Sequence, residues 1–303
     1  MSALLDKRLV IVTGKGGTGK STVAAALGLA ALRQGKRALL VEVAEQERLA
    51  GMFGRRPAPG AEITLERGLH GLSIDPRRAA EEWLHHQLRS GALASVLGHS
   101  RVFQLLTAAA PGVNELVTMG KIWDTAQLER RTGGPSFDVV ILDAPASGHG
   151  LALLGAPASY ARIARVGPVA RQAERIDAFT HDRSETAVVA VALPEEIPVT
   201  ETIELEGWLE DEGFALELVI VNALYPERLD SEETKRLEGA GDVHPAVAVA
   251  LGEHRRAVAQ REQAERLAEG LSAPLACLPF LFDPKLGRPQ LGELSELLEE
   301  ELA

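Results

Sequence analysis

The stretch LVIVTGKGGTGKST at residues 9–22 decides the fold of this chain, because it joins a short apolar strand, a glycine loop and the start of a helix. The loop has the spacing G-x-x-x-x-G-K-[S/T], with Gly14, Gly19, Lys20 and Ser21 at the defining positions. Glycines allow the backbone to turn successive N–H groups inward around an anion. The stretch therefore predicts a cradle for nucleotide phosphates. A chance glycine turn is the alternative, and it leaves the flanking strand and helix unexplained.

The residues of this loop have separate predicted roles. Lys20 is expected to reach the outer phosphates, and Ser21 to offer its hydroxyl to Mg2+. The helix that follows, from residue 21 to about 34, points its positive N-terminal end at the same phosphates. The expected ligands are ATP and Mg2+. The nucleotide-binding residues predicted from this stretch are Gly14, Gly16, Gly17, Thr18, Gly19, Lys20, Ser21 and Thr22.

Strand and helix signals alternate along the chain, which predicts an α/β fold with a doubly wound, mostly parallel sheet and helices on both faces. Between about residues 75 and 132 the signals are helical only. The pattern predicts an ATPase domain formed by residues 1–75 and 133–303, with a helical insertion at 76–132. Residues 55–62 are expected to form a loop. The predicted strands are residues 8–12, 38–43, 72–74, 137–142, 187–193, 216–221 and 275–278.

Composition excludes several classes of partner. The 303 residues carry a net charge of −11 with a pI near 5.3, which disfavours a nucleic-acid-binding face. The single cysteine, Cys277, cannot form an internal disulfide framework or a multi-cysteine metal site, and a cytoplasmic location is the default. No apolar run is long enough to span a membrane, and the acidic stretch at 291–303 is expected to be a closing helix.

A strand that ends in an aspartate is the usual partner of such a loop, and DVVILDAPASGHG at residues 138–150 supplies one. In P-loop NTPases this aspartate holds Mg2+, often through a water, so Asp143 is predicted to serve the metal together with Ser21. A plain strand-end cap is the alternative. His149 is either part of a switch that moves when the γ-phosphate leaves or an ordinary loop histidine.

Lys15 directly follows Gly14 and gives GKGGTGKS, which resembles the deviant Walker A class. That class includes the partition and cell-division ATPases, the nitrogenase iron protein, and the ArsA and guided-entry ATPases. In such proteins the extra lysine crosses a dimer interface to the nucleotide of the other subunit. The resemblance implies a nucleotide-sandwich dimer in which Lys15 is catalytic. A solvated loop lysine is the alternative.

The segment LDAPASGHGLALLGAP at residues 142–157 is similar to switch II of the ArsA and guided-entry ATPases. LSIDP at 72–76 and PGVNEL at 111–116 are similar to two further motifs of that family, so the resemblance covers nearly the whole chain in order. It implies an ATP hydrolase. VIVNAL at 219–224 and LPFLFDP at 278–284 match its adenine-recognition segments, which implies that Asn222, Pro279 and Phe280 bind the base.

The chain departs from this family at switch I. The family has D-P-A-H after its second strand, and the aspartate orients the attacking water; here VEVAEQERLAGMFG at 41–54 puts Ala44 at that position. Alanine cannot accept a hydrogen bond from water. Glu42 or Glu45 could substitute, so both join Lys15, Lys20 and Asp143 as catalytic candidates. Weak or partner-dependent hydrolysis is the alternative.

These features favour a cytoplasmic, Mg-dependent dimeric ATPase whose nucleotide cycle controls a hydrophobic protein client or another partner at the helical insertion. The apolar stripe after Gly112 is either core or a client groove. Lone Cys277 excludes a CxxC zinc site and makes arsenite an unexpected ligand. A homodimer and a heterodimer with a related ATPase both remain open, the latter describing a scaffold or regulatory subunit. A partition or division-site ATPase is disfavoured by the acidic composition.

Overall fold

Eight strands form one sheet in the computed structural model, which describes residues 2–43, 48–87, 112–131, 133–164, 166–239 and 245–302. The strand order is β3-β4-β2-β5-β1-β6-β7-β8, and every neighbouring pair is parallel except β3 and β4. The predicted α/β fold with a mostly parallel sheet is confirmed. The strands are β1 Leu9–Thr13, β2 Ala38–Val43, β3 Glu62–Glu66, β4 Leu69–Ile74, β5 Val139–Asp143, β6 Thr186–Ala192, β7 Leu216–Leu224 and β8 Leu275–Pro279.

Strand β3 is the one described strand that the sequence did not predict. The loop expected at residues 55–62 ends one residue early, and Glu62 begins an antiparallel edge strand beside β4. In β3 only Leu65 is buried, because the strand has one neighbour and exposes much of its surface. An edge strand of this kind lacks the continuous apolar run used to find the others.

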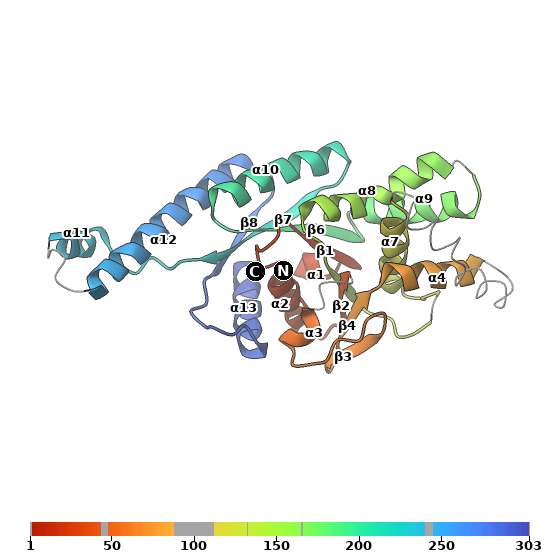
Figure 1. The fold of residues 1–303 in the computed structure, drawn as a ribbon, viewed down its shortest axis with the longest axis horizontal. Coiled ribbons are helices and arrows are strands. Elements are labelled where there is room, and N and C mark those ends of the chain that lie inside the picture. The colour runs from red at the N-terminus through yellow and green to blue at the C-terminus, as the bar shows by residue number, and fades with distance from the viewer. Residues whose placement is uncertain are drawn as a thin grey trace.

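Helices cover both faces of the sheet (Figure 1). One face is packed by α2 and α13, whose Leu27 and Leu294 join Val10 and Val12 of β1. The other face is packed by α7, α8 and α10, whose Met119, Leu153 and Leu205 share a core cluster with Ile11. The described helices are α1 Ser2–Leu5, α2 Lys20–Arg33, α3 Leu49–Met52, α4 Pro76–Gln87, α7 Val113–Ala126, α8 Ser147–Ala164, α9 Pro168–His181, α10 Glu196–Asp211, α11 Ser231–Gly239, α12 Pro245–Gly270 and α13 Arg288–Glu301. Among the described residues, no helix combines the length and apolar character needed to cross a membrane.

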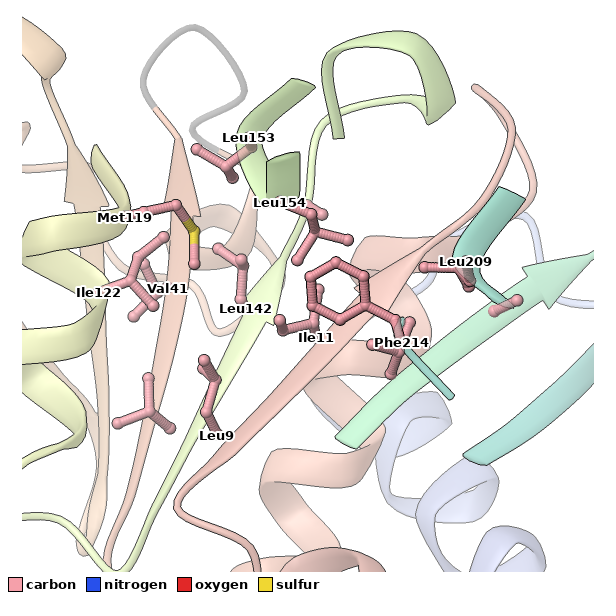
Figure 2. Close-up of a cluster of buried hydrophobic side chains, with 14 of the residues drawn as sticks. Leu9, Ile11, Val41, Met119, Ile122, Leu142, Leu153, Leu154, Leu209 and Phe214 are labelled. Atoms are coloured by element: carbon pink, nitrogen blue, oxygen red, sulfur yellow. The ribbon is translucent and has the colours of Figure 1, made fainter. Parts of the chain in front are cut away.

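Helix α7, from the predicted insertion, shares its core with the sheet. Met119 and Ile122 are fully buried and point toward Val41 of β2 and Leu142 of β5 (Figure 2). The partly buried side chains of the same stripe, Val113, Leu116 and Trp123, pack against this cluster. Much of the stripe is therefore core. Pro111, the first residue of the PGVNEL motif, lies outside the described residues.

Replacing Met119 with alanine is expected to lower the free energy of unfolding by about 2–5 kcal/mol, because the substitution removes a fully buried side chain and leaves a cavity. Chemical denaturation of the purified protein measures the change. Met52→Ala is the matched control, since Met52 is only partly buried at the end of α3 and should cost less. An equal loss for the two variants would contradict a shared core between α7 and the sheet.

Candidate functional site

The glycine loop lies between β1 and α2, at the carboxyl edge of the sheet. Gly14, Gly17 and Gly19 all have positive φ, at 132°, 88° and 94°. A Cβ on Gly14 would lie 2.4 Å from the carbonyl oxygen of Val191, and one on Gly19 would lie 2.1 Å from the side-chain nitrogen of Asn222. Both positions thus require glycine for conformation and for space. The loop is held tightly against the ends of β6 and β7.

Lys20 opens α2 and is nearly buried inside this loop. Its Nζ donates to the carbonyl oxygen of Lys15 at 2.9 Å, and the hydroxyl of Thr18 donates to the same oxygen at 3.0 Å. Burial lowers the pKa of Lys20, while the Asp143 carboxylate raises it and the Arg48 charge lowers it. A buried ammonium gains from an anion placed beside it, so this environment suits a phosphate.

Asp143 ends β5 and is fully buried. Its register neighbours are Val12 on β1 and Glu42 on β2, which places it at the centre of the carboxyl edge. Ser21 donates a hydrogen bond to Asp143 Oδ2 at 2.5 Å. Burial raises the pKa of Asp143, opposed by the Ser21 hydrogen bond and by the charges of Lys20 and Arg48.

The second carboxylate oxygen of Asp143 is available as a metal ligand. Oδ1 is buried and has no hydrogen-bond partner among the residues that the structure describes. A hydroxyl beside a carboxylate with an unsatisfied oxygen is the donor set that Mg2+ prefers, since this cation takes oxygen ligands and retains several waters. The residues therefore fit Mg2+, which Ser21 and Asp143 would hold, directly or through water.

Lys15 projects from the loop toward α10. Its Nζ lies 2.5 Å from Glu201 Oε1, and the two side chains are 35% and 37% exposed. The sequence did not single out Glu201, because it is far from the loop along the chain and only the packing of α10 brings the two residues together. Lys15 is thus paired within its own subunit.

The residues expected to bind the base lie at the adjacent ends of β7 and β8. Asn222 donates from Nδ2 to the carbonyl oxygen of Thr18 at 2.8 Å, which ties it to the phosphate loop. Ala223 follows with φ of 60°, a left-handed conformation at a register shift between β7 and β8. Pro279 ends β8, and the backbone N–H of Phe280 donates to the Leu224 carbonyl oxygen at 2.8 Å.

An aromatic cluster lies beside the adjacent ends of β7 and β8. Phe280 stacks on Tyr225 with ring centroids 4.6 Å apart, and Phe282 meets both rings edge-on. Arg256 lies over the Tyr225 ring, 4.5 Å from its centroid. Tyr225 was not among the predicted site residues. Its position directly after the apolar part of β7, near the aromatic residues that follow β8, is the signal that could have revealed it.

Of the two acids proposed to replace the switch I aspartate, the structure describes only Glu42. Glu42 is buried at the end of β2, and its Oε2 accepts the backbone N–H groups of Arg48 at 2.9 Å and Leu49 at 3.3 Å. This carboxylate therefore fixes the start of α3. Ala44 and Glu45 lie outside the described residues. The role of an acid in orienting water remains a prediction.

His149 lies in α8, at the edge of an open hollow. The hollow is bounded by the end of β2, by the starts of α4 and α7, and by the segment after Asp143. Asp75 precedes α4, and Asn114 and Glu115 belong to the first turn of α7; all three line the same hollow. The segment predicted to be a switch thus faces two helices of the predicted insertion.

The chain is similar in sequence to known ATPases. A family model described as anion-transporting ATPase matches residues 7–172 and 161–246. ATPase BagA of Mycobacterium tuberculosis (strain ATCC 25618 / H37Rv) is 34% identical over 247 residues, covering 80% of this chain and 72% of the relative. The arsenical pump-driving ATPase of Acidiphilium multivorum is 27% identical over 88% of this chain and 44% of its own length. ATPase GET3 of Phaeosphaeria nodorum is 28% identical, over 57% of this chain and 53% of its own.

Proposed function

Because the chain belongs to the anion-transporting ATPase family and is an ATP hydrolase of that family, we propose that it acts as a Mg-dependent dimer that opens and closes with its nucleotide cycle. The observation that carries this proposal is the single edge on which the loop, buried Asp143 and Asn222 converge. We place the dimer in the cytoplasm, as the lone cysteine leads us to expect.

Each group at this edge has a role in the proposal. The loop N–H groups and Lys20 bind the phosphates, where the positive end of α2 adds to the attraction. Ser21 and Asp143 hold Mg2+, which neutralises phosphate charge when bound. At the end of the site that receives the base, Asn222 recognises the adenine, and Pro279 and Phe280 pack against the adenine ring. The aromatic ring of Phe280 is already fixed by its stacking on Tyr225.

Lys15 links nucleotide binding to dimer formation. In the proposal it leaves Glu201 and reaches the phosphates of the nucleotide bound by the partner subunit. The Lys15–Glu201 pair is about one-third exposed, so it costs little to break, typically under about 1 kcal/mol. A triphosphate on the other subunit offers more negative charge than one carboxylate and favours the exchange.

The helical segment is the proposed site of control. Release of the γ-phosphate would move the segment that follows Asp143, and the hollow that His149 shares with Asp75 and Glu115 connects this movement to α4 and α7. We propose that residues 76–132 respond as a subdomain and bind a hydrophobic protein client or another partner. Much of the α7 stripe is used for the core, so a client would bind elsewhere on this segment.

Replacing Lys15 with alanine is expected to remove ATP-dependent dimerisation while leaving ATP binding by the monomer largely intact, because Lys15 already lies outside its own phosphate loop against Glu201. The test measures ATP affinity, turnover and mass in solution on one preparation. Glu201→Gln is the matched variant, since it releases Lys15 without removing it and should still dimerise. The sandwich dimer is wrong if ATP does not increase the mass of the wild type, or if Lys15→Ala still dimerises.

Ala44 supports a second candidate function. A family member without the water-orienting aspartate would hydrolyse ATP slowly or only beside a related subunit that supplies the acid, as a scaffold or regulatory subunit does. Glu42 favours this view, because its Oε2 is engaged by the start of α3. Turnover by the isolated protein separates the two: steady hydrolysis that Asp143→Ala abolishes supports the self-sufficient enzyme, and hydrolysis that appears only with a second ATPase supports the regulatory subunit.

A further inference from the structure

Strand β7 has a bulge beside the phosphate loop. From Val221 to Leu224 it advances three residues, whereas β8 advances two between the matching register positions. The extra residue bends the strand at Ala223, whose φ is 60°, and no other non-glycine residue in the described part of the chain has a positive φ. A left-handed backbone is strained for alanine and persists only where the surrounding contacts enforce it. Bulges of this kind redirect the side chains that follow them.

The bulge brings the end of β7 against the segment that follows β8. The backbone N–H of Phe280 donates to the Leu224 carbonyl oxygen at 2.8 Å, and Tyr225 stacks on the Phe280 ring with the two planes 24° apart. Phe280 is only partly buried despite this stacking. Asn222, on the other side of the bulge, donates to the phosphate loop. The aromatic pair and the loop therefore lie along the same end of β7.

Helix α12 holds Tyr225 by its backbone and by its ring. The backbone N–H of Tyr225 donates to Gln260 Oε1 at 2.7 Å, and Gln260 is 6% exposed. The Arg256 guanidinium lies over the ring of Tyr225, 4.5 Å from its centroid. Residues four apart in sequence lie on one face of a helix, so both contacts come from the same side of α12. Breaking the hydrogen bond would leave a buried amide oxygen without its donor, which is unfavourable.

A ring whose orientation is already fixed suits the binding of a flat base. A mobile aromatic side chain loses rotational freedom when a ligand packs on it, and this loss weakens binding. Phe280 is restrained from two directions, because Tyr225 stacks on it and Phe282 meets it edge-on with centroids 4.9 Å apart. Every nucleobase has a π-face that can stack on such a ring. The cluster thus resembles a prepared platform more than an ordinary part of the core.

We propose that Tyr225 is a positioning residue for the base and acts through Phe280. Gln260 and Arg256 hold Tyr225 in place, and the bulge at Ala223 sets the register that brings the two rings together. The inference rests on the proposed function, because it takes Phe280 as a residue on which adenine packs. Adenine adds a third layer to the Tyr225–Phe280 stack. Affinity for the base is then controlled partly by a helix outside the nucleotide site.

The test compares a non-hydrolysable ATP analogue with tripolyphosphate, which has the phosphates without the base, both with Mg2+. Tyr225→Leu removes the ring but keeps an apolar side chain. Loss of an aromatic pair predicts about 3- to 10-fold weaker binding of the ATP analogue, with tripolyphosphate affinity changed less than about twofold. KM for ATP should rise while kcat stays near the wild-type value, because the reaction takes place at the phosphate end. Tyr225→Phe keeps the ring and should restore wild-type binding.

Arg256→Ala tests the contribution of α12. It should weaken the ATP analogue selectively, as Tyr225→Leu does but by less, because the ring remains. Arg255→Ala is the matched control, since Arg255 is exposed at the neighbouring position of the same helix and should change neither affinity. Thermal melting shows whether each variant is folded. If Tyr225→Leu does not fold, Arg256→Ala carries the test in its place.

A double-mutant cycle separates positioning from an independent effect. If Tyr225 acts through Phe280, Tyr225→Leu should cost little further affinity once Phe280→Leu is present. The inference is overturned if the two losses multiply, or if Tyr225→Leu weakens the ATP analogue and tripolyphosphate equally. It is also overturned if Phe280→Leu weakens the ATP analogue and Tyr225→Leu does not. Wild-type binding of the ATP analogue by Phe280→Leu would instead contradict the base-binding role of Phe280 in the proposed function, and the inference with it.

Discussion

Lys20→Ala is expected to weaken ATP binding by about 100-fold or more and to reduce turnover to background, the largest effect of any single substitution in this chain. Lys20 is nearly buried at the centre of the loop, where its ammonium already donates to a loop carbonyl oxygen. A bound phosphate would replace that weak acceptor with a charged one. Alanine removes both the charge and the donor, and water cannot readily fill the space at the same strength.

Equilibrium binding of a fluorescent ATP analogue and a phosphate-release assay measure these two effects. Lys235→Ala is the control, since Lys235 is exposed on α11. Melting curves without nucleotide should show little loss of stability for Lys20→Ala, because burial lowers the pKa of this lysine and makes its charge costly in the empty site. ATP binding within a factor of three of the wild type would exclude a phosphate-binding role for Lys20.

Asp143→Asn is expected to reduce turnover by at least about 100-fold and to remove most of the Mg2+ dependence of ATP binding. The asparagine amide keeps the shape of the side chain but offers a neutral oxygen in place of a carboxylate. The unsatisfied Oδ1 of the wild type is the atom that a cation would use. Titration of the protein with Mg2+ at fixed ATP measures the change, and Asp211→Asn, at the exposed end of α10, is the control.

The same variant should stabilise the nucleotide-free protein near neutral pH. Burial raises the pKa of Asp143 above its unfolded value, so the folded protein binds a proton more readily than the unfolded chain. The folded state therefore becomes more stable as the pH falls through the raised pKa. The melting temperature of Asp143→Asn should exceed that of the wild type at neutral pH, and the difference should shrink on acidification. A difference that grows at low pH would show that the carboxylate is stabilised in the fold.

Local patterns in the sequence revealed most of this architecture. The glycine loop and the apolar strands can each be recognised from a few consecutive residues, so the doubly wound sheet could be predicted from local sequence patterns. The resemblance to the ArsA and guided-entry ATPases is confirmed by the matching family model and relatives. The edge strand β3 was missed because it has one neighbour and a single buried residue, which leaves little hydrophobic pattern to detect.

Contacts between distant segments were harder to predict than the elements themselves. Glu201 meets Lys15 only because α10, which packs against β6 and β7, passes beside the phosphate loop, and no periodicity in either segment indicates that pairing. Glu42 was predicted as a possible substitute for the switch I aspartate, because a carboxylate can accept a hydrogen bond from the attacking water. In the structure its Oε2 accepts hydrogen bonds from two backbone N–H groups at the start of α3. The sequence shows which hydrogen bonds and ion pairs a side chain can form, whereas its neighbours in the fold determine which of its groups are already engaged.

In the proposed function, the contact between Asn222 and the phosphate loop links recognition of the base to binding of the phosphates. At rest Asn222 donates to the Thr18 carbonyl oxygen, and Gly19 leaves no room for a side chain between them. The amide nitrogen of Asn222 carries a second hydrogen and its Oδ1 accepts, so a base can engage this side chain while it still donates to the loop. The protein would sense a complete nucleotide rather than its separate parts, so free phosphate or free adenosine would each be a poor trigger of the cycle.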